Sequence, residues 1–247
     1  MDKDNKLLSG AEDLYGLCEK RGCAVFSRFY DEAEQTLLSD SGLLRGGGIF
    51  FGGHSECERK ILGVFPEWEE PCYESFPIRL LKISSGYKKT LSHRDYLGSL
   101  MGLGIERDRI GDILVYDGSA CVFVHESVAV YVKESLNKIG SVGVSADFGE
   151  LTGFEYPPHR FEEIETVAAS LRLDAVLAAA LGLSRSEAAA LTERERVSVN
   201  HRIQADSSKK VCEGDLLSVR GFGRYIIGEA GGQTRKGRIH LTVKKYL

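Results

Sequence analysis

The chain has 247 residues, of which 43% are hydrophobic, enough for more than one compact core. It has no run of 18 apolar residues, so we expect no membrane span, and its polar first residues differ from a secretory signal. The six cysteines are scattered without a C-x-x-C pair. This pattern favours reduced thiols in a cytoplasmic protein over a disulfide framework or a zinc site.

The formal net charge of −4 conceals an asymmetry along the chain. Residues 164–247 carry 14 Lys and Arg against 9 Asp and Glu, whereas residues 1–163 carry 18 against 27. The two parts therefore have net charges of +5 and −9. A basic end on an acidic chain indicates a polyanionic partner at that end, although charge alone does not distinguish RNA from DNA or an acidic protein.

The first part of the chain, residues 1–76, predicts an N-terminal α/β subdomain. Apolar residues recur at helical spacing from Lys3 to about Cys23, and a second helix is predicted over 31–39. Short strands are predicted in the glycine-rich stretch 46–53 and over 59–65. The glycine-rich stretch lacks the G-K-[ST] and G-x-G-x-x-G patterns, so a tight turn is favoured over phosphate binding.

The second part, residues 77–160, predicts a ferredoxin-like domain. Its predicted strands and helices follow the order β-α-β-β-α-β, at 78–84, 92–103, 111–116, 120–126, 127–139 and 142–148. Asp117-Gly118 predicts a type I′ hairpin turn. RNA-recognition domains use the same order, but their aromatic stacking signature is absent, so RNA contact here would depend on charge or shape.

Basic side chains are concentrated around the first strand and the first helix of this second part. They predict a secondary RNA contact, although a solvated surface explains them equally well; they are Lys82, Lys88, Lys89, His93 and Arg94.

The third part begins with two short predicted helices. Gly182 is placed to end the first helix with a left-handed cap, and Ser184 has capping-box spacing to a glutamate, so the second helix is predicted to start at Arg185. Strands are predicted at 197–200, which alternates, and at 216–220, after a Gly-Asp turn.

Arg185 is unusual for its predicted position. A cation in the first turn faces the positive end of the helix dipole, which costs from a few tenths to about 1 kcal/mol. A phosphate bound at that helix end would reverse the sign, since amide N–H groups and the arginine would share one anion. A solvated arginine explains the local pattern equally well.

The third part, residues 164–247, resembles the S-four domain, a small RNA-binding module named after small-ribosomal-subunit protein four. The resemblance rests on R-L-D in the first helix, S-R-S-E opening the second, then V-x-V-N and G-D before a strand. It implies two short helices with a small mixed sheet, and an RNA face formed by Arg172, Ser184, Arg185, Asn200, Lys209 and Lys210. The family usually has glycines where this chain has Glu195-Arg196 and His201-Arg202, so differently built turns are predicted there.

Nearly the whole chain resembles YlmH-type bacterial RNA-binding proteins. The resemblance is carried by F-G-G-H at 51–54 with E-R-K at 58–60, L-S-H-R-D-Y-L-G at 91–98, L-G-I-E-R at 103–107 with I-G-D-I at 110–113, and R-G-F-G-R at 220–224 with T-R-K-G-R at 234–238. The basic residues of the last two stretches are predicted to add to the RNA-binding set; they are Arg220, Arg224, Arg235, Lys236 and Arg238.

This resemblance implies a non-catalytic factor in an α+β fold of three parts. It would bind the large ribosomal subunit through ribosomal RNA, together with a stalled peptidyl-tRNA, and act in ribosome-associated quality control. The expected protein is cytoplasmic and monomeric when free, with no cofactor, metal, membrane or small-molecule substrate.

Two other classes of function are open to the sequence. The alternative is an RNA-modifying enzyme, similar to a pseudouridine synthase, that uses the S-four domain only for docking. Its catalytic aspartate has no recognisable context here, since Asp112 and Asp147 are as easily turn or edge residues. The six histidines also show no metal-ligand spacing, and no G-x-S-x-G or Cys/His signature occurs. The third class, a structural partner of cell-division or membrane proteins, lacks an amphipathic anchor.

Overall fold

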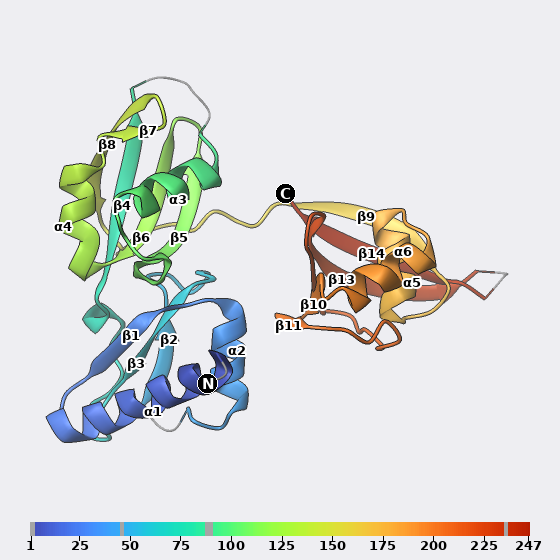
Figure 1. Cartoon of the computed structure of the whole chain (residues 1–247), viewed down its shortest axis with the longest axis horizontal. Coiled ribbons are helices and arrows are strands. Elements are labelled where there is room, and N and C mark those ends of the chain that lie inside the picture. Colours follow the sequence, from blue (N-terminus) through green and yellow to red (C-terminus); the bar gives the residue numbers. More distant parts are fainter. Residues whose placement is uncertain (1–2, 45–46, 87–90, 235–236) are drawn as a thin grey trace. The chain divides into compact units, whose positions relative to one another are not determined.

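The computed structural model describes residues 3–44, 47–86, 91–234 and 237–247. It divides into two compact units, unit 1 from Met1 to Pro157 and unit 2 from Pro158 to Leu247 (Figure 1). Helices and antiparallel sheets occur in both, which confirms the predicted α+β class. Among the described residues, no helix is both long enough and apolar enough to cross a membrane.

Unit 1 begins with a three-stranded antiparallel sheet in the order β1-β3-β2 and two helices that pack on it. The elements are α1 (Lys3–Arg21), β1 (Val25–Tyr30), α2 (Glu32–Asp40), β2 (Gly48–Phe51) and β3 (Lys60–Val64). α2 starts at a capping box, in which Asp31 accepts the N–H of Glu34 and Glu34 accepts that of Asp31. Both helices agree with the prediction, whereas the sequence pattern does not predict β1.

The rest of unit 1 has the ferredoxin-like order of elements. They are η1 (Tyr73–Ser75), β4 (Ile78–Ser85), α3 (His93–Gly102), η2 (Arg107–Arg109), β5 (Ile110–Tyr116), β6 (Ser119–His125), α4 (Glu126–Ser135), β7 (Lys138–Ile139) and β8 (Val142–Gly149). The sheet order is β5-β6-β4-β8-β7, with side chains of α3 and α4 in one core cluster with the strands. Only Gly118 has a positive φ in the β5–β6 turn, so the predicted type I′ turn, which needs two, is wrong.

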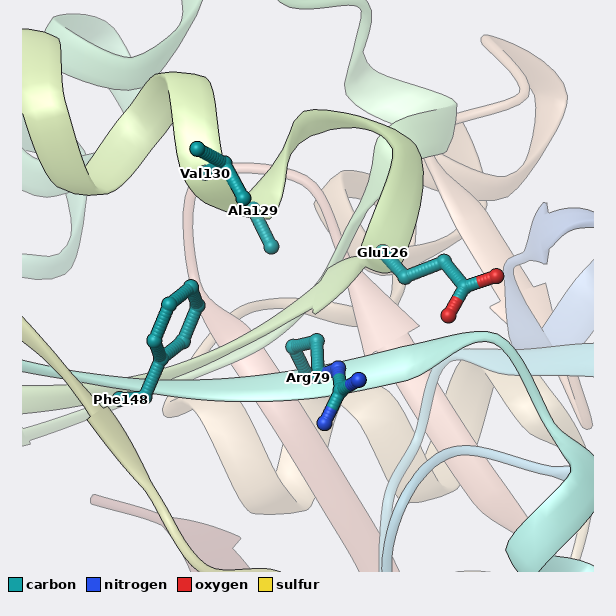
Figure 2. Close-up of a pocket in the computed structure, with 5 residues that line it drawn as sticks. All are labelled: Arg79, Glu126, Ala129, Val130 and Phe148. Atoms are coloured by element: carbon teal, nitrogen blue, oxygen red, sulfur yellow. The ribbon is translucent and has the colours of Figure 1, made fainter.

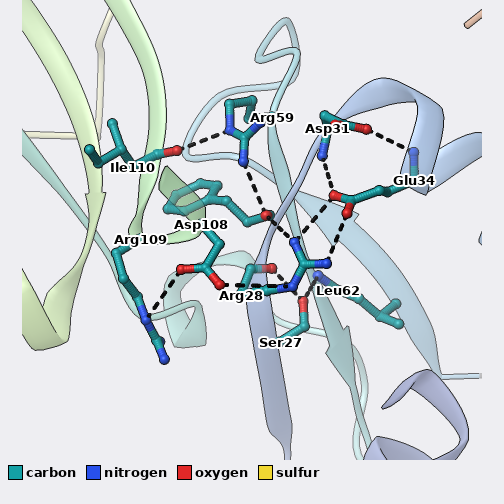
Figure 3. Close-up of polar contacts among 10 residues, drawn as sticks. Ser27, Arg28, Asp31, Glu34, Arg59, Leu62, Asp108, Arg109 and Ile110 are labelled. Atoms are coloured by element: carbon teal, nitrogen blue, oxygen red, sulfur yellow. Dashed lines mark hydrogen bonds and ion pairs between the residues drawn. The ribbon is translucent and has the colours of Figure 1, made fainter. Parts of the chain in front are cut away.

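Arginine side chains hold the two sheets of unit 1 together (Figure 3). Arg59 donates from Nε to the carbonyl of Ile110 at 3.0 Å and from Nη2 to the carbonyl of Phe29 at 3.2 Å. Arg28 binds both carboxylate oxygens of Glu34, at 2.9 and 3.2 Å. These donors are therefore directed to acceptors inside the unit.

Unit 2 is a six-stranded sheet with two helices on one face (Figure 1). Its elements are β9 (Phe161–Ala168), α5 (Leu173–Leu181), α6 (Arg185–Glu193), β10 (Val197–Val199), β11 (Arg202–Ile203), β12 (Leu216–Val219), β13 (Gly223–Gln233) and β14 (Ile239–Tyr246). The order is β11-β10-β12-β13-β14-β9, and every described pairing is antiparallel. The predicted small mixed sheet is therefore wrong in size and in strand direction.

The strand β10 lies between two turns that keep a left-handed backbone without glycine. Glu195 has a φ of 55° before the strand, and Asn200 and His201 have φ values of 48° and 65° after it. Positive φ at both central residues is the geometry of a type I′ turn. Glu195, Asn200 and His201 thus adopt a left-handed backbone without glycine, and the prediction that these turns differ from the family's stays a prediction. Each non-glycine residue in this conformation costs roughly 1–2 kcal/mol.

Candidate nucleic-acid interface

The helix ends of unit 2 follow the predicted capping signals. α5 ends at Gly182, which has a φ of 67° and donates its N–H to the carbonyl of Ala178. α6 starts at Ser184, whose hydroxyl accepts the N–H of Glu187 while that carboxylate accepts the N–H of Ser184 at 2.8 Å. Arg185 is therefore the first residue of α6, as predicted.

A buried carboxylate connects the start of α5 to the start of α6. Asp174 accepts two hydrogen bonds from Arg172, at 3.2 and 3.3 Å, and one from Nη2 of Arg185 at 2.7 Å. The Asp174 side chain is only 8% exposed, while those of Arg172 and Arg185 are 45% and 54% exposed. We call these three residues the arginine–aspartate cluster.

The electrostatics of the arginine–aspartate cluster favour the ionised carboxylate. Burial raises the pKa of Asp174, but the hydrogen bonds and charges of Arg172 and Arg185 outweigh it and hold that pKa below its ordinary value. The carboxylate orients the two guanidinium groups, and both remain half exposed at the surface. Two oriented arginines can bind phosphate oxygens without first losing much rotamer freedom.

Two predicted lysines lie on the segment that pairs with the start of α5. The N–H of Leu173 donates to the carbonyl of Lys209 at 2.8 Å, and Arg172 forms an isolated antiparallel bridge with Lys210. Both lysines are exposed. The structure therefore brings four predicted residues together, namely Arg172, Arg185, Lys209 and Lys210.

This geometry corrects the reason for which Arg185 was expected to meet a phosphate. Its unfavourable place at a helix N-terminus was expected to be relieved by that anion, whereas Asp174 already supplies the negative charge. The position of Arg185 at the helix N-terminus is therefore no longer a reason to expect a bound anion. The exposed half of the guanidinium group, oriented by Asp174, is what remains in favour of RNA contact.

Two other residues of the predicted RNA face have structural roles. Asn200 donates from Nδ2 to Asp215 at 2.8 Å and accepts the N–H of Leu216 at 2.9 Å, which ties the β10–β11 turn to β12. The hydroxyl of Ser184 donates to Glu187 at 2.7 Å within the helix cap. Because both side chains are used inside unit 2, neither residue is assigned to the RNA interface.

The remaining predicted cations of unit 2 do not join the arginine–aspartate cluster. Arg224 is on the sheet face that alternates with the buried Tyr225, so it points away from α5 and α6. Arg220 is in the turn before Arg224, and Arg238 is exposed immediately before β14. Arg235 and Lys236 lie outside the described residues.

The secondary contact predicted in unit 1 is only partly described. His93 and Arg94 are exposed in the first turn of α3, whereas Lys88 and Lys89 lie outside the described residues. Partial burial of the imidazole and the charge of Arg107 lower the pKa of His93. Both effects disfavour the charged form of the ring.

The two aspartates with catalytic potential are placed as structural residues. Asp112 is buried and accepts the N–H of Glu58 at 2.7 Å, that of Arg59 at 3.0 Å, and the hydroxyl of Tyr156 at 3.0 Å. It thus joins the E-R-K and I-G-D-I stretches. Asp147 is 73% exposed on β8, 3.5 Å from Lys133.

Unit 1 also has a depression beside α4. Figure 2 shows its lining of Ala129, Val130 and Phe148, with Arg79 and Glu126 at its margin. This lining contains neither histidine nor cysteine. Across the described ranges, no three His, Cys, Asp or Glu side chains are grouped to hold a metal ion.

The arginine–aspartate cluster depends on a residue that is absent from the predicted site. Asp174 is eleven positions before Arg185, and only the packing of α5 against α6 brings them together. The R-L-D stretch contains Asp174, but sequence spacing alone does not reveal that it is shared by two arginines.

Comparisons with known proteins agree with this organisation. The family model for the RNA-binding domain in YlmH matches residues 71–152, and that for the S4 (S-four) domain matches residues 171–217. Ribosome-associated protein quality control protein P2 of Bacillus subtilis (strain 168) is 33% identical over 219 residues, which is 88% of this chain and 85% of that protein. The solved structure of cell division protein ylmH from Streptococcus pneumoniae has a TM-score of 0.53 at 21% identity, over 62% of this chain and 94% of that one, and shows a likeness of fold. The chain belongs to the YlmH family of RNA-binding proteins with an S4 domain.

Proposed function

We propose that this protein is a non-catalytic cytoplasmic factor that binds ribosomal RNA of the large subunit, together with a stalled peptidyl-tRNA. The observation that carries the proposal is the arginine–aspartate cluster, where buried Asp174 orients the half-exposed Arg172 and Arg185 beside Lys209 and Lys210. The Bacillus subtilis relative is named for ribosome-associated quality control, which supports the same process for this chain.

The cluster suits the backbone of a folded RNA. Guanidinium groups bind phosphate oxygens through paired hydrogen bonds, and structured RNA is recognised mainly through its phosphates and shape. Each phosphate that is neutralised releases counterions, so binding weakens as the salt concentration rises. We propose that the arginine–aspartate cluster and the two lysines bind consecutive phosphates in this way, without reading bases.

The enzyme alternative is less well supported by the aspartates of unit 1. Asp112 already accepts three hydrogen bonds in the unit, two of them from backbone N–H groups. We propose that Asp112 stabilises the junction between the E-R-K and I-G-D-I stretches of unit 1 and takes no part in chemistry. Nucleoside analysis by mass spectrometry, after incubation with ribosomal RNA and tRNA, should show no new pseudouridine or methylated base, and either product would overturn this part of the proposal.

The central test compares two arginines on the same helix. Arg185→Gln removes a cation at the start of α6, while Arg194→Gln removes an exposed cation at its other end. With purified large subunits, Arg185→Gln should flatten the slope of log affinity against log salt by about 0.7 to 0.9, and Arg194→Gln should leave it unchanged. Equal slopes for both variants would contradict the proposed site.

The RNA partner itself can be identified by crosslinking in cells. Reads from the wild-type protein should map to large-subunit ribosomal RNA and to tRNA, and Arg185→Gln should reduce the reads at one of these while Arg194→Gln does not. Reads confined to messenger RNA would contradict the ribosomal assignment.

A further inference from the structure

The sheet face of unit 2 that points away from α5 and α6 has its own chemistry. Buried side chains such as Leu217, Val219 and Tyr225 point toward the helices, so the alternating residues lie on the open face. Two sets of paired residues cross this face: Ile203, Ser198, Ser218 and Arg224 on β11, β10, β12 and β13, and Tyr246 and Phe161 on β14 and β9. The contact of Arg224 with the Tyr246 ring joins the two sets into one row.

One end of this row is an aromatic cluster formed by His159, Phe161 and Tyr246. The Phe161 and Tyr246 rings meet edge to face with centroids 4.8 Å apart, and His159 lies 5.4 Å from Tyr246. The guanidinium carbon of Arg224 is 4.5 Å from the Tyr246 ring centroid, within cation–π distance. Phe161 remains 37% exposed, so part of this aromatic cluster is open to solvent next to a cation.

The rest of the row opens into a groove that we call the arginine groove. It is lined by Arg196, Arg220 and Arg224 together with Ser198, Ser218 and Ile203 of the sheet, and Glu195 is its one acidic residue. Arg196 is fixed across it, since its Nη2 donates to the carbonyl of Arg220 at 3.0 Å. Three arginines against one glutamate make the groove cationic.

We propose that this face binds unpaired RNA nucleotides. Bases stack on Phe161 and Tyr246, while Arg196, Arg220 and Arg224 contact the phosphates that follow along the groove. Aromatic rings beside a cationic groove are the surface that single-stranded nucleic acids use, since every base has a flat face to stack. An acidic peptide would pair with the arginines but would give the rings no flat partner.

This second surface is separate from the proposed function. The arginine–aspartate cluster lies at the helix ends, whereas the aromatic cluster and the arginine groove lie on the sheet face that points away from the helices. Unit 2 would therefore hold a folded RNA at one surface and an unpaired segment at the other. Either interaction can fail without the other.

The first test uses two exposed residues on the same face of β9. Phe161 pairs with Tyr246 at one end, and Val167, also 37% exposed, pairs with His240 near the other end. In the full chain, Phe161→Ala should lower affinity for single-stranded oligouridylate about five-fold or more, and Val167→Ala should change it less than about two-fold. Affinity for an RNA hairpin should be unchanged in both variants. Equal effects of the two variants on oligouridylate would overturn the proposal.

The second test detects RNA binding directly at the aromatic cluster. The chain has a single tryptophan, Trp68, so Phe161→Trp in a Trp68→Phe background places the only indole on the aromatic cluster. Oligouridylate should quench its fluorescence, and should still do so after Arg172→Gln and Arg185→Gln. Quenching by polyglutamate but not by oligouridylate would overturn the proposal. It would also be overturned if the variant with both Arg172→Gln and Arg185→Gln bound neither oligouridylate nor the RNA hairpin.

Discussion

Arginine side chains bind oxygen acceptors in both units, but the guanidinium groups differ in how far they remain exposed. In unit 1, Arg59 donates to backbone carbonyls that precede α2 and begin β5, and Arg28, 33% exposed, forks onto a glutamate. In unit 2, the carboxylate of Asp174 is the buried partner, and the arginines remain about half exposed above it. The same residue types therefore form a structural joint in one unit and a surface charge in the other.

The carboxylate is the more buried partner in both ion pairs, since Glu34 is 11% and Asp174 8% exposed, so the difference lies in the exposure of the arginines. Arg59 is partly buried, its Nε and Nη2 donate to carbonyls inside unit 1, and burial lowers its pKa. Asp174, in contrast, orients two arginines whose side chains remain 45% and 54% exposed. Exposure of the guanidinium group, rather than the presence of an ion pair, separates a binding arginine from a structural one.

The largest effect is expected when the acceptor Asp112, which joins the E-R-K and I-G-D-I stretches of unit 1, is removed. Asp112→Ala leaves the N–H groups of Glu58 and Arg59 and the Tyr156 hydroxyl without their acceptor. We expect the free energy of unfolding to fall by about 3 kcal/mol, measured by urea denaturation. Asp147→Ala, on an exposed strand position, should change it by less than about 0.5 kcal/mol. Similar losses for both variants would contradict a structural role for Asp112.

The next largest effect should come from the arginine–aspartate cluster. Asp174→Asn should lower stability by about 2 kcal/mol at pH 7, because charge-assisted hydrogen bonds to a buried carboxylate are lost. The folded-state pKa of Asp174 is below its ordinary value of 3.8, so its contribution is present above that pH and disappears as the pH falls through the lower folded value. The wild-type and variant stabilities, measured by thermal unfolding, should therefore begin to converge as the pH falls below about 4 and should converge fully below the folded pKa. A constant difference down to pH 2 would show that the carboxylate charge is not involved.

The comparison becomes sharper when one arginine from each unit is tested for both RNA binding and stability. Arg185→Gln should weaken RNA binding by about 1–2 kcal/mol, as for a charge-assisted hydrogen bond, and Arg59→Gln should leave binding unchanged. Stability should respond in the opposite sense, with the larger loss in Arg59→Gln. Binding titrations and urea denaturation of both variants provide the four values, and a variant that lowers both quantities equally would contradict the division of roles.

The smallest effect should come from the backbone beside the arginine groove. Glu195 has a φ of 55°, so Glu195→Gly should relieve strain and be more stable than Glu195→Gln by about 0.5 kcal/mol, after the greater freedom of glycine in the unfolded chain is subtracted. Both variants remove the same charge, so RNA affinity should be equal between them. Equal melting temperatures would show that the left-handed turn carries no strain.

Local patterns predicted much of the fold where each element has its own signal. The capping boxes at Ser92 and Ser184 and the left-handed Gly182 marked helix ends correctly. β9 could not be predicted from a local pattern, because its glutamates lie on both faces of the strand and disrupt the alternation of apolar and polar residues. Pairing with β14 stabilises this strand, and Glu162 and Glu163 form ion pairs with lysines of β14 at 3.6 and 3.5 Å. β1 was missed for a related reason, since the hydroxyl of Ser27 meets the backbone of the neighbouring β3.

The candidate site was predictable in residue type and only partly in role. The positions of Arg172 and Arg185 followed from the S4 pattern, and the structure brings them together. Asp174 could not be assigned because it acts through packing of α5 on α6. Asn200 illustrates the converse, since a side chain expected to meet RNA is instead hydrogen-bonded between a turn and β12.

The pairing of β9 with β14 also affects the order in which the protein becomes functional during translation. β9 is an edge strand whose partner in the sheet is β14, and Ala168 pairs with Ile239 across the whole intervening sequence. Unit 1 can therefore fold while the ribosome is still elongating the chain, whereas the sheet of unit 2 stays open until β14 has emerged from the exit tunnel. The aromatic cluster includes residues from both strands, so the nascent chain cannot stack RNA bases there before that moment. Synthesis thus delays this surface until the last strand of its sheet is available.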